Sequence, residues 1–96
     1  MLGDLGADVI KVEKPGSGDE SRGWGPPFDE RGQSAYYLSI NRNKLDVALD
    51  LRNPEDRKVA VDLAMQADVV IDNFATHRDA SPLLDADDLL ARNERL

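Results

Sequence analysis

The chain has 96 residues, of which 41% are hydrophobic and 32% are charged, a composition typical of one small globular domain. Its formal net charge of −7 argues against a general nucleic-acid binder and opposes adsorption to an anionic membrane. Because cysteine is absent, a disulfide framework and a thiolate zinc site are excluded. No apolar stretch is long enough to span a membrane and no signal peptide is evident, so we expect a cytoplasmic protein.

The first half of the chain predicts one strand followed by a long loop. Residues 1–6 resemble the last turn of a helix that Gly6 ends, and since this helix has no N-cap we expect upstream residues to be missing. Residues 8–13 predict a β-branched strand. Residues 14–33 contain five glycines and three prolines, which rules out a regular element, and loops of this length are usually functional. Residues 34–40 predict a short helix or an extended piece.

The second half predicts a strand, a helix, another strand and a final helix. Residues 46–51 form the first of these strands, and Asn53 then caps a helix that has Pro54 in its first position. Residues 68–72 have the Val-Val-Ile run of a strand buried on both faces, which completes a right-handed βαβ unit. Residues 85–92 predict an amphipathic helix. The expected fold is α/β: a Rossmann-like parallel sheet layer with flanking helices, truncated at both ends, in one partial domain over residues 1–96.

Candidate ligand-binding residues lie where the predicted strands end. Lys14 and Arg52 follow two strands of one parallel sheet, at the edge where α/β proteins bind ligands. Their cations suit phosphate groups, although a solvated surface charge is the alternative for each. Asn73 and Phe74 end the last strand, and they suit hydrogen bonding to and stacking on an adenine, or else a strand cap and a core ring. No metal-ligand cluster is evident, and we expect no metal.

Four blocks of sequence, taken in order, carry a family resemblance. They are LGADVIKVEK at 5–14, LSINRNK at 38–44, VALDLR at 47–52 and DVVIDNF at 68–74. Together they resemble the N-terminal part of the class III CoA-transferases, which include formyl-CoA transferase, carnitine CoA-transferase and α-methylacyl-CoA racemase. Asn41-Arg42-Asn43-Lys44 is the most family-specific short match, and a structural turn and a ligand contact are equally good readings of it.

The resemblance assigns two sets of residues to coenzyme A, bound as an acyl-CoA substrate. The set implied to contact the CoA nucleotide consists of Lys14, Leu49, Asp50, Leu51, Arg52, Asn73 and Phe74. The set implied to form a loop over the acyl end of the thioester consists of Arg22, Gly23 and Trp24. For Trp24 the alternative is that it pins a glycine-rich loop to the body of the domain.

The resemblance also implies the chemistry, the transfer of CoA between an acyl-CoA and a carboxylic acid. The family's nucleophile is an aspartate that carries the acyl group, and it lies beyond Leu96. We therefore assign no catalytic residue here and expect these residues alone to be inactive. Full-length members form interlocked homodimers. The alternatives are a stand-alone module for CoA or adenine nucleotides, an inactive gene remnant, and a parent enzyme that racemises acyl-CoA.

Overall fold

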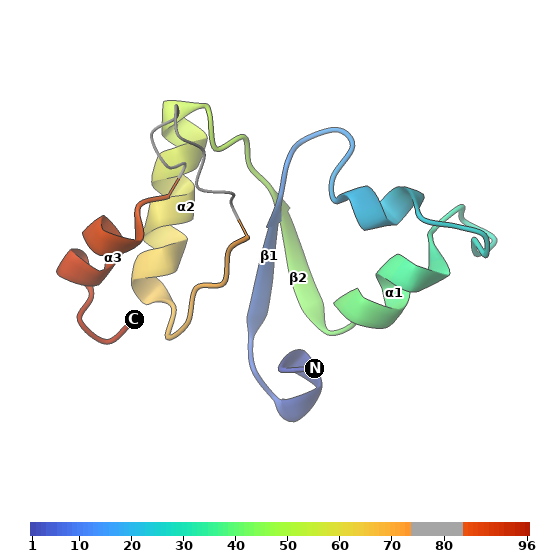
Figure 1. The fold of residues 1–96 in the computed structure, drawn as a ribbon, viewed down its shortest axis with the longest axis horizontal. Coiled ribbons are helices and arrows are strands. Elements are labelled where there is room, and N and C mark those ends of the chain that lie inside the picture. The colour runs from blue at the N-terminus through green and yellow to red at the C-terminus, as the bar shows by residue number, and fades with distance from the viewer. Residues whose placement is uncertain (74–83) are drawn as a thin grey trace. The chain divides into compact units, whose positions relative to one another are not determined.

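The computed structural model describes residues 1–73 and 84–96 of the chain (Figure 1). Its elements, in order, are a 3₁₀ turn Gly3–Leu5, β1 Val9–Glu13, a 3₁₀ turn Glu20–Gly23, α1 Ala35–Asn41, β2 Lys44–Ala48, α2 Pro54–Gln66 and α3 Ala86–Arg92. Contacts divide the chain into two compact units, Met1–Leu49 and Asp50–Leu96. The parallel sheet lies in the first unit, and both units contain helices, so the predicted α/β class is confirmed.

The sheet of the first unit has two parallel strands with two different faces. β1 and β2 lie side by side, with a register that runs from Val9 opposite Lys44 to Glu13 opposite Ala48 (Figure 1). Because side chains alternate along a strand, the sheet has a polar and an apolar face. The polar face carries Lys11, Glu13, Lys44 and Asp46. The apolar face carries Ile10, Val12, Leu45 and Val47.

Residues 41–44 form a structural turn between α1 and β2. Asp4 accepts hydrogen bonds from Arg42 Nη2 at 2.9 Å and from Asn43 Nδ2 at 2.8 Å, and Asn43 has a left-handed φ of 60°. Lys44 Nζ donates to Asn41 Oδ1 at 3.1 Å, and the Asn41 amide donates to a backbone carbonyl of α1. All four side chains of this family-specific match therefore have partners inside the chain, which favours the turn over the ligand contact.

The second unit is built on the N-cap of α2 and on small residues. Asn53 Oδ1 accepts hydrogen bonds from two backbone N–H groups of the first turn, at 2.9 and 3.3 Å, and Pro54 is the first helical residue, as predicted. Ala60 and Ala64 are buried on α2, as is Leu89 on α3. The two helices are in contact, and Asn93, the C-cap of α3, donates its Nδ2 to the Met65 carbonyl of α2 at 3.3 Å.

Replacing Asn53 with alanine is expected to lower the unfolding free energy of this unit by about 1 kcal/mol, since two N–H groups lose their acceptor. Asn53→Asp is the matched control, because it keeps the acceptor and adds a negative charge at the positive end of the helix dipole. Thermal unfolding followed by far-UV circular dichroism measures both variants. An equal loss in the aspartate variant would contradict the assigned role of the cap.

Two strand predictions are wrong, the first in its limits and the second in expecting a strand at all. The strand expected over 46–51 is β2, Lys44–Ala48, so it begins and ends earlier. Residues 68–72 form no strand in the described part of the chain, so the predicted βαβ unit is not formed there. Val69 is 67% exposed and Ile71 is 79% exposed, whereas the sequence predicted burial. A strand requires a paired neighbour, and the described sheet contains only β1 and β2.

Most of the remaining element predictions are confirmed. Residues 14–33, expected to contain no regular element, are an exception, because Asp19 caps the 3₁₀ turn Glu20–Gly23 there. Gly6, with a φ of 97°, ends the first turn, residues 34–40 are mostly helical in α1, and the final helix begins after Asp85 as its N-cap. Across the described residues, no helix is both long and apolar enough to span a bilayer.

Candidate functional site

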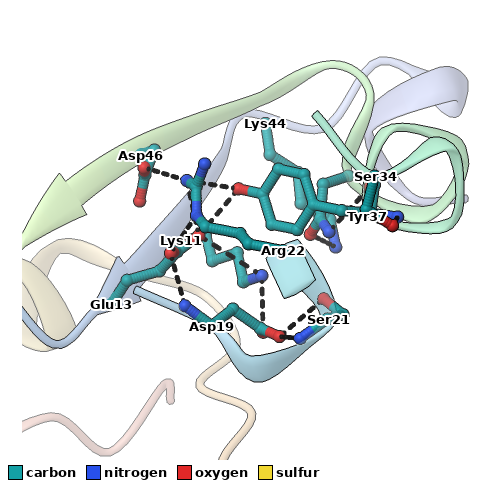
Figure 2. A network of polar contacts seen from close by, with 10 residues as sticks. Lys11, Glu13, Asp19, Ser21, Arg22, Ser34, Tyr37, Lys44 and Asp46 are labelled. Atoms are coloured by element: carbon teal, nitrogen blue, oxygen red, sulfur yellow. Dashed lines mark hydrogen bonds and ion pairs between the residues drawn. The ribbon is translucent and has the colours of Figure 1, made fainter. Parts of the chain in front are cut away.

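The polar face of the sheet carries a group of charged side chains from four parts of the first unit (Figure 2). We call it the Glu13 cluster, and it consists of Lys11, Glu13, Asp19, Arg22, Tyr37 and Asp46. Its members come from β1, from the loop over 14–33, from α1 and from β2. The cluster therefore ties the long loop to both strands and to the helix.

Glu13 is the centre of the cluster, with an exposed fraction of 6%. Its Oε2 accepts hydrogen bonds from the Asp19 backbone N–H at 2.8 Å and from Arg22 Nε at 2.7 Å. Its Oε1 accepts from Arg22 Nη2 at 3.1 Å and from the Tyr37 hydroxyl at 2.7 Å. The hydrogen bonds from Arg22 lower the pKa of Glu13 to about 2, against the opposing effect of burial. The carboxylate is therefore ionised at neutral pH.

Arg22 joins three elements through one nitrogen. Its Nη2 reaches Glu13 Oε1, the Tyr37 hydroxyl at 2.6 Å and Asp46 Oδ2 at 2.7 Å. Its Cζ also lies 4.1 Å from the centroid of the Tyr37 ring, in cation–π distance. Burial, and then the hydrogen bond to Glu13, raise the pKa of Tyr37 to about 12. Glu13 and Tyr37 thus each keep one protonation state across the neutral range, as befits an anchor rather than a general acid or base.

Asp19 starts the 3₁₀ turn that contains Arg22. Its Oδ1 accepts hydrogen bonds from the Ser21 backbone N–H at 2.7 Å and from the Ser21 hydroxyl at 2.6 Å. Its Oδ2 forms an ion pair with Lys11 Nζ at 2.7 Å. Hydrogen bonds from Lys11 and Ser21 hold the pKa of Asp19 well below its usual range. Asp19 therefore fixes the turn to β1 as well as starting it.

Trp24 is the C-cap of the same turn and has three points of attachment. Its backbone N–H donates to the Ser21 carbonyl at 3.2 Å, and its own carbonyl accepts from the Ser34 hydroxyl. Ser34 has no exposed surface and is also the N-cap of α1. The indole ring lies 5.1 Å from the Tyr36 ring, and Trp24 is 53% exposed. Trp24 is therefore held by its backbone and one ring contact, with half of its surface open.

The structure thus brings together the three residues of the predicted substrate loop. Arg22 and Gly23 lie in the 3₁₀ turn Glu20–Gly23, and Trp24 follows it directly. The Arg22 guanidinium points into the Glu13 cluster (Figure 2), whereas Gly23 is exposed.

The loop from Asp50 to Arg52, predicted to contact the nucleotide, is fixed by the beginning of α2. The Asp50 backbone N–H donates to Asp56 Oδ2 at 2.9 Å, and Asp50 Oδ1 accepts from the Arg52 backbone N–H at 3.0 Å. The Leu51 carbonyl accepts from Arg57 Nε at 2.8 Å. These bonds define the backbone of the loop. The Arg52 side chain is exposed and has no partner among residues 1–73 and 84–96.

The other predicted nucleotide contacts fall in three places. Lys14 follows β1 and is exposed, while Leu49 follows β2, is 8% exposed and donates its backbone N–H to the Glu13 carbonyl at 2.9 Å. The end of the sheet therefore brings Lys14 and Leu49 together. Asn73 is exposed in the second unit, and Phe74 lies outside the described residues. Within the described part of the chain, no group of three or more His, Asp or Glu side chains could hold a metal ion.

The Glu13 cluster was not predicted from the sequence, although the sequences of the two strands contain a pattern that points to it. Lys11 and Glu13 occupy alternate positions of β1, and Lys44 and Asp46 occupy alternate positions of β2. Charges at a spacing of two indicate that one sheet face is polar. That pattern predicts a polar covering layer, but it does not identify Tyr37 or Arg22 as members of it.

Comparisons with known proteins give one consistent family. The model of CoA-transferase family III matches residues 1–96. The chain is 52% identical over 73 residues to the Homo sapiens succinyl-CoA:glutarate CoA-transferase, which is 76% of this chain and 16% of that protein. It is 45% identical to the Agrobacterium fabrum succinate–glutarate CoA-transferase, over 100% of this chain and 25% of that protein.

A solved structure agrees with these matches. The crystal structure of a CaiB/BaiF family protein from Brucella suis superposes with a TM-score of 0.80 at 44% identity, over 96% of this chain and 25% of that one. The chain thus spans a quarter or less of the length of each of these three proteins. Sequence and fold agree over nearly all of its residues, and the chain belongs to CoA-transferase family III.

Proposed function

We propose that residues 1–96 are the N-terminal, CoA-binding portion of an enzyme that moves CoA between an acyl-CoA and a carboxylic acid. Family membership supports this, as do the names of the human and Agrobacterium relatives, which pair succinate or succinyl-CoA with glutarate. We extend the proposal to a short dicarboxylic acid as acceptor. The nucleophilic aspartate lies outside these residues, and the interlocked homodimer and the cytoplasmic location belong to the same proposal.

The main support for the proposal is the position of the Arg52 cation on a turn whose backbone is fixed. Arg52 lies on a loop whose backbone is held by Asp56 and Arg57, while its own guanidinium has no partner in the described ranges. A turn fixed before binding costs little ordering entropy when a ligand arrives. In the first unit, Lys14 is likewise an exposed cation, which follows the end of β1. The 3′-phosphate and pyrophosphate of CoA are the anions that such cations would bind.

Arg52→Glu is expected to raise the KM for acyl-CoA about tenfold or more and to change kcat much less, because a charge-assisted hydrogen bond is replaced by repulsion. The measurement uses a chimera in which these residues replace the matching part of the Agrobacterium relative. Arg31→Glu is the matched control, since Arg31 is exposed and its side chain has no partner among the described residues.

An unchanged KM in Arg52→Glu would reject the role of Arg52 in binding CoA. An equal rise in Arg31→Glu would assign the effect to net charge and not to a site. Calorimetric titration of the 96-residue chain with CoA at millimolar concentration tests the stand-alone alternative. Binding that Arg52→Glu abolishes would show that these residues hold CoA without the rest of the enzyme.

A further inference from the structure

We propose that Arg22 is a positioning residue, which holds Trp24 in place through the Glu13 cluster instead of contacting the substrate. The proposal rests on the proposed function in one respect: the loop that carries Trp24 is taken to face the acyl end of CoA. The attachment itself is independent of that function, and it depends only on contacts within the first unit.

Arg22 lies in the 3₁₀ turn that Trp24 ends, so the two residues share one short piece of backbone. The Arg22 guanidinium bonds to Glu13 on β1 and to Asp46 on β2. Those two carboxylates are carried by β1 and β2, which are paired with each other in the sheet. A turn anchored to both strands cannot shift without breaking the two ion pairs.

The helix α1 provides a second path between the cluster and Trp24. The Tyr37 hydroxyl donates to Glu13 and accepts from Arg22, which attaches α1 to the cluster. The neighbouring residue Tyr36 contacts the Trp24 ring, and Ser34 donates to the Trp24 carbonyl. Tyr37 thus attaches α1 to the cluster, and Tyr36 of the same helix contacts the Trp24 ring. Loss of Arg22 would loosen both paths.

The ion pairs of Arg22 argue against its direct binding of a substrate carboxylate. The cluster contains two cations, Lys11 and Arg22, and three carboxylates, and with Lys44 of the same sheet face the charges balance when all six groups are ionised. The carboxylates are those of Glu13, Asp19 and Asp46. An incoming carboxylate would have to displace Glu13 or Asp46, which already pair with the Arg22 guanidinium. Arg22 also uses Nε and Nη2 for partners within the chain.

Trp24 is the only tryptophan, so its fluorescence reports on this segment directly. In the 96-residue chain, Arg22→Gln is expected to shift the emission maximum to longer wavelength and to raise the acrylamide quenching constant. Arg31→Gln, in the same loop, is the matched control and should leave both unchanged. Tyr37→Phe removes one hydroxyl and should give a smaller change of the same sign, which keeps the test informative if Arg22→Gln does not fold.

The catalytic consequence is tested in the chimera described above. Arg22→Gln is expected to lower kcat about tenfold to 100-fold, as misplaced active-site groups do, with little change in the KM for acyl-CoA. Unchanged Trp24 fluorescence in both Arg22→Gln and Tyr37→Phe would overturn the proposal. A raised KM for the carboxylate substrate with unchanged fluorescence would also overturn it, because Arg22 would then contact the substrate directly. Altered fluorescence with normal kcat would also overturn it.

The results for Arg52→Glu and Arg22→Gln distinguish a failure of the proposed function from a failure of the positioning role. If Arg52→Glu leaves the KM for acyl-CoA unchanged, the CoA site is rejected, while the fluorescence result for Arg22 stands. If Arg52→Glu behaves as expected but Arg22→Gln changes neither fluorescence nor kcat, only the positioning role is rejected.

Discussion

Glu13→Gln is expected to lower the unfolding free energy of the first unit by about 2–3 kcal/mol at neutral pH. Glutamine has nearly the same shape, but its amide NH₂ would face the Arg22 and Tyr37 donors that the buried carboxylate now satisfies. Arg22 is 36% exposed along its side chain, so water compensates part of the loss. Urea unfolding followed by Trp24 fluorescence measures the change.

We expect the stability that Glu13→Gln loses to depend on pH. The pKa of Glu13 is lowered from 4.5 to about 2 in the folded chain, so the folded state favours the ionised form. Its contribution is therefore complete above pH 4.5 and is lost as the pH falls from 4.5 to about 2. The difference in stability between the wild type and Glu13→Gln should shrink across this window. The wild type keeps some acid sensitivity from Asp19, whose pKa is also lowered.

Glu30→Gln is the matched control for both measurements. Glu30 is an exposed carboxylate of the same loop with no partner among the described residues, so its variant should unfold as the wild type does. A gap between the wild type and Glu13→Gln that stays constant from neutral pH to about pH 3 would contradict the assignment, because the linkage requires it to narrow.

Gly18→Ala is expected to cost about 2–4 kcal/mol of unfolding free energy, from two separate causes. Gly18 has a φ of 65°, where an L side chain is strained. A Cβ there would also meet the Glu13 carboxylate and lie 2.7 Å from Arg22 Nε. Both of those groups are fixed by the cluster and cannot move away without breaking their hydrogen bonds.

Gly16→Ala separates the two causes. Gly16 has a φ of 81°, but a Cβ there would meet nothing within 4 Å. Gly16→Ala therefore loses unfolding free energy only through its strained backbone conformation. The difference between the two variants is the effect of crowding the cluster, which we expect to be about 1–3 kcal/mol. Urea unfolding of both chains measures it. Equal losses of unfolding free energy would mean that the Glu13 cluster accommodates the added methyl group without being destabilised.

Local sequence was sufficient for the elements whose ends are defined by neighbouring residues. The β-branched run predicted β1 to within one residue, and Asn53 with Pro54 predicted the start of α2. These features depend on side chains that act on their own backbone or on the next turn. The family was likewise evident from short blocks of sequence, and the match over residues 1–96 confirms it.

The limits of β2 were not predictable in the same way. Its start is set by the left-handed Asn43, which is held by Asp4 from the other end of the unit. Beyond its end, the Asp50 N–H donates to Asp56 and so is not available to a neighbouring strand. The apolar alternation continues through Leu51, so periodicity alone placed the strand too late.

By itself the sequence determined the family, the α/β class and those element ends that local capping controls. Only the tertiary structure decided that Arg22 faces Glu13 and Asp46, since Asp46 is 24 residues away along the chain. It also decided that residues 68–72, apolar enough for a strand, form none in the described part of the chain. The physical reason is the same in both cases. Ion pairs and strand pairing require a partner distant in sequence, and its position is set by the fold and not by local pattern.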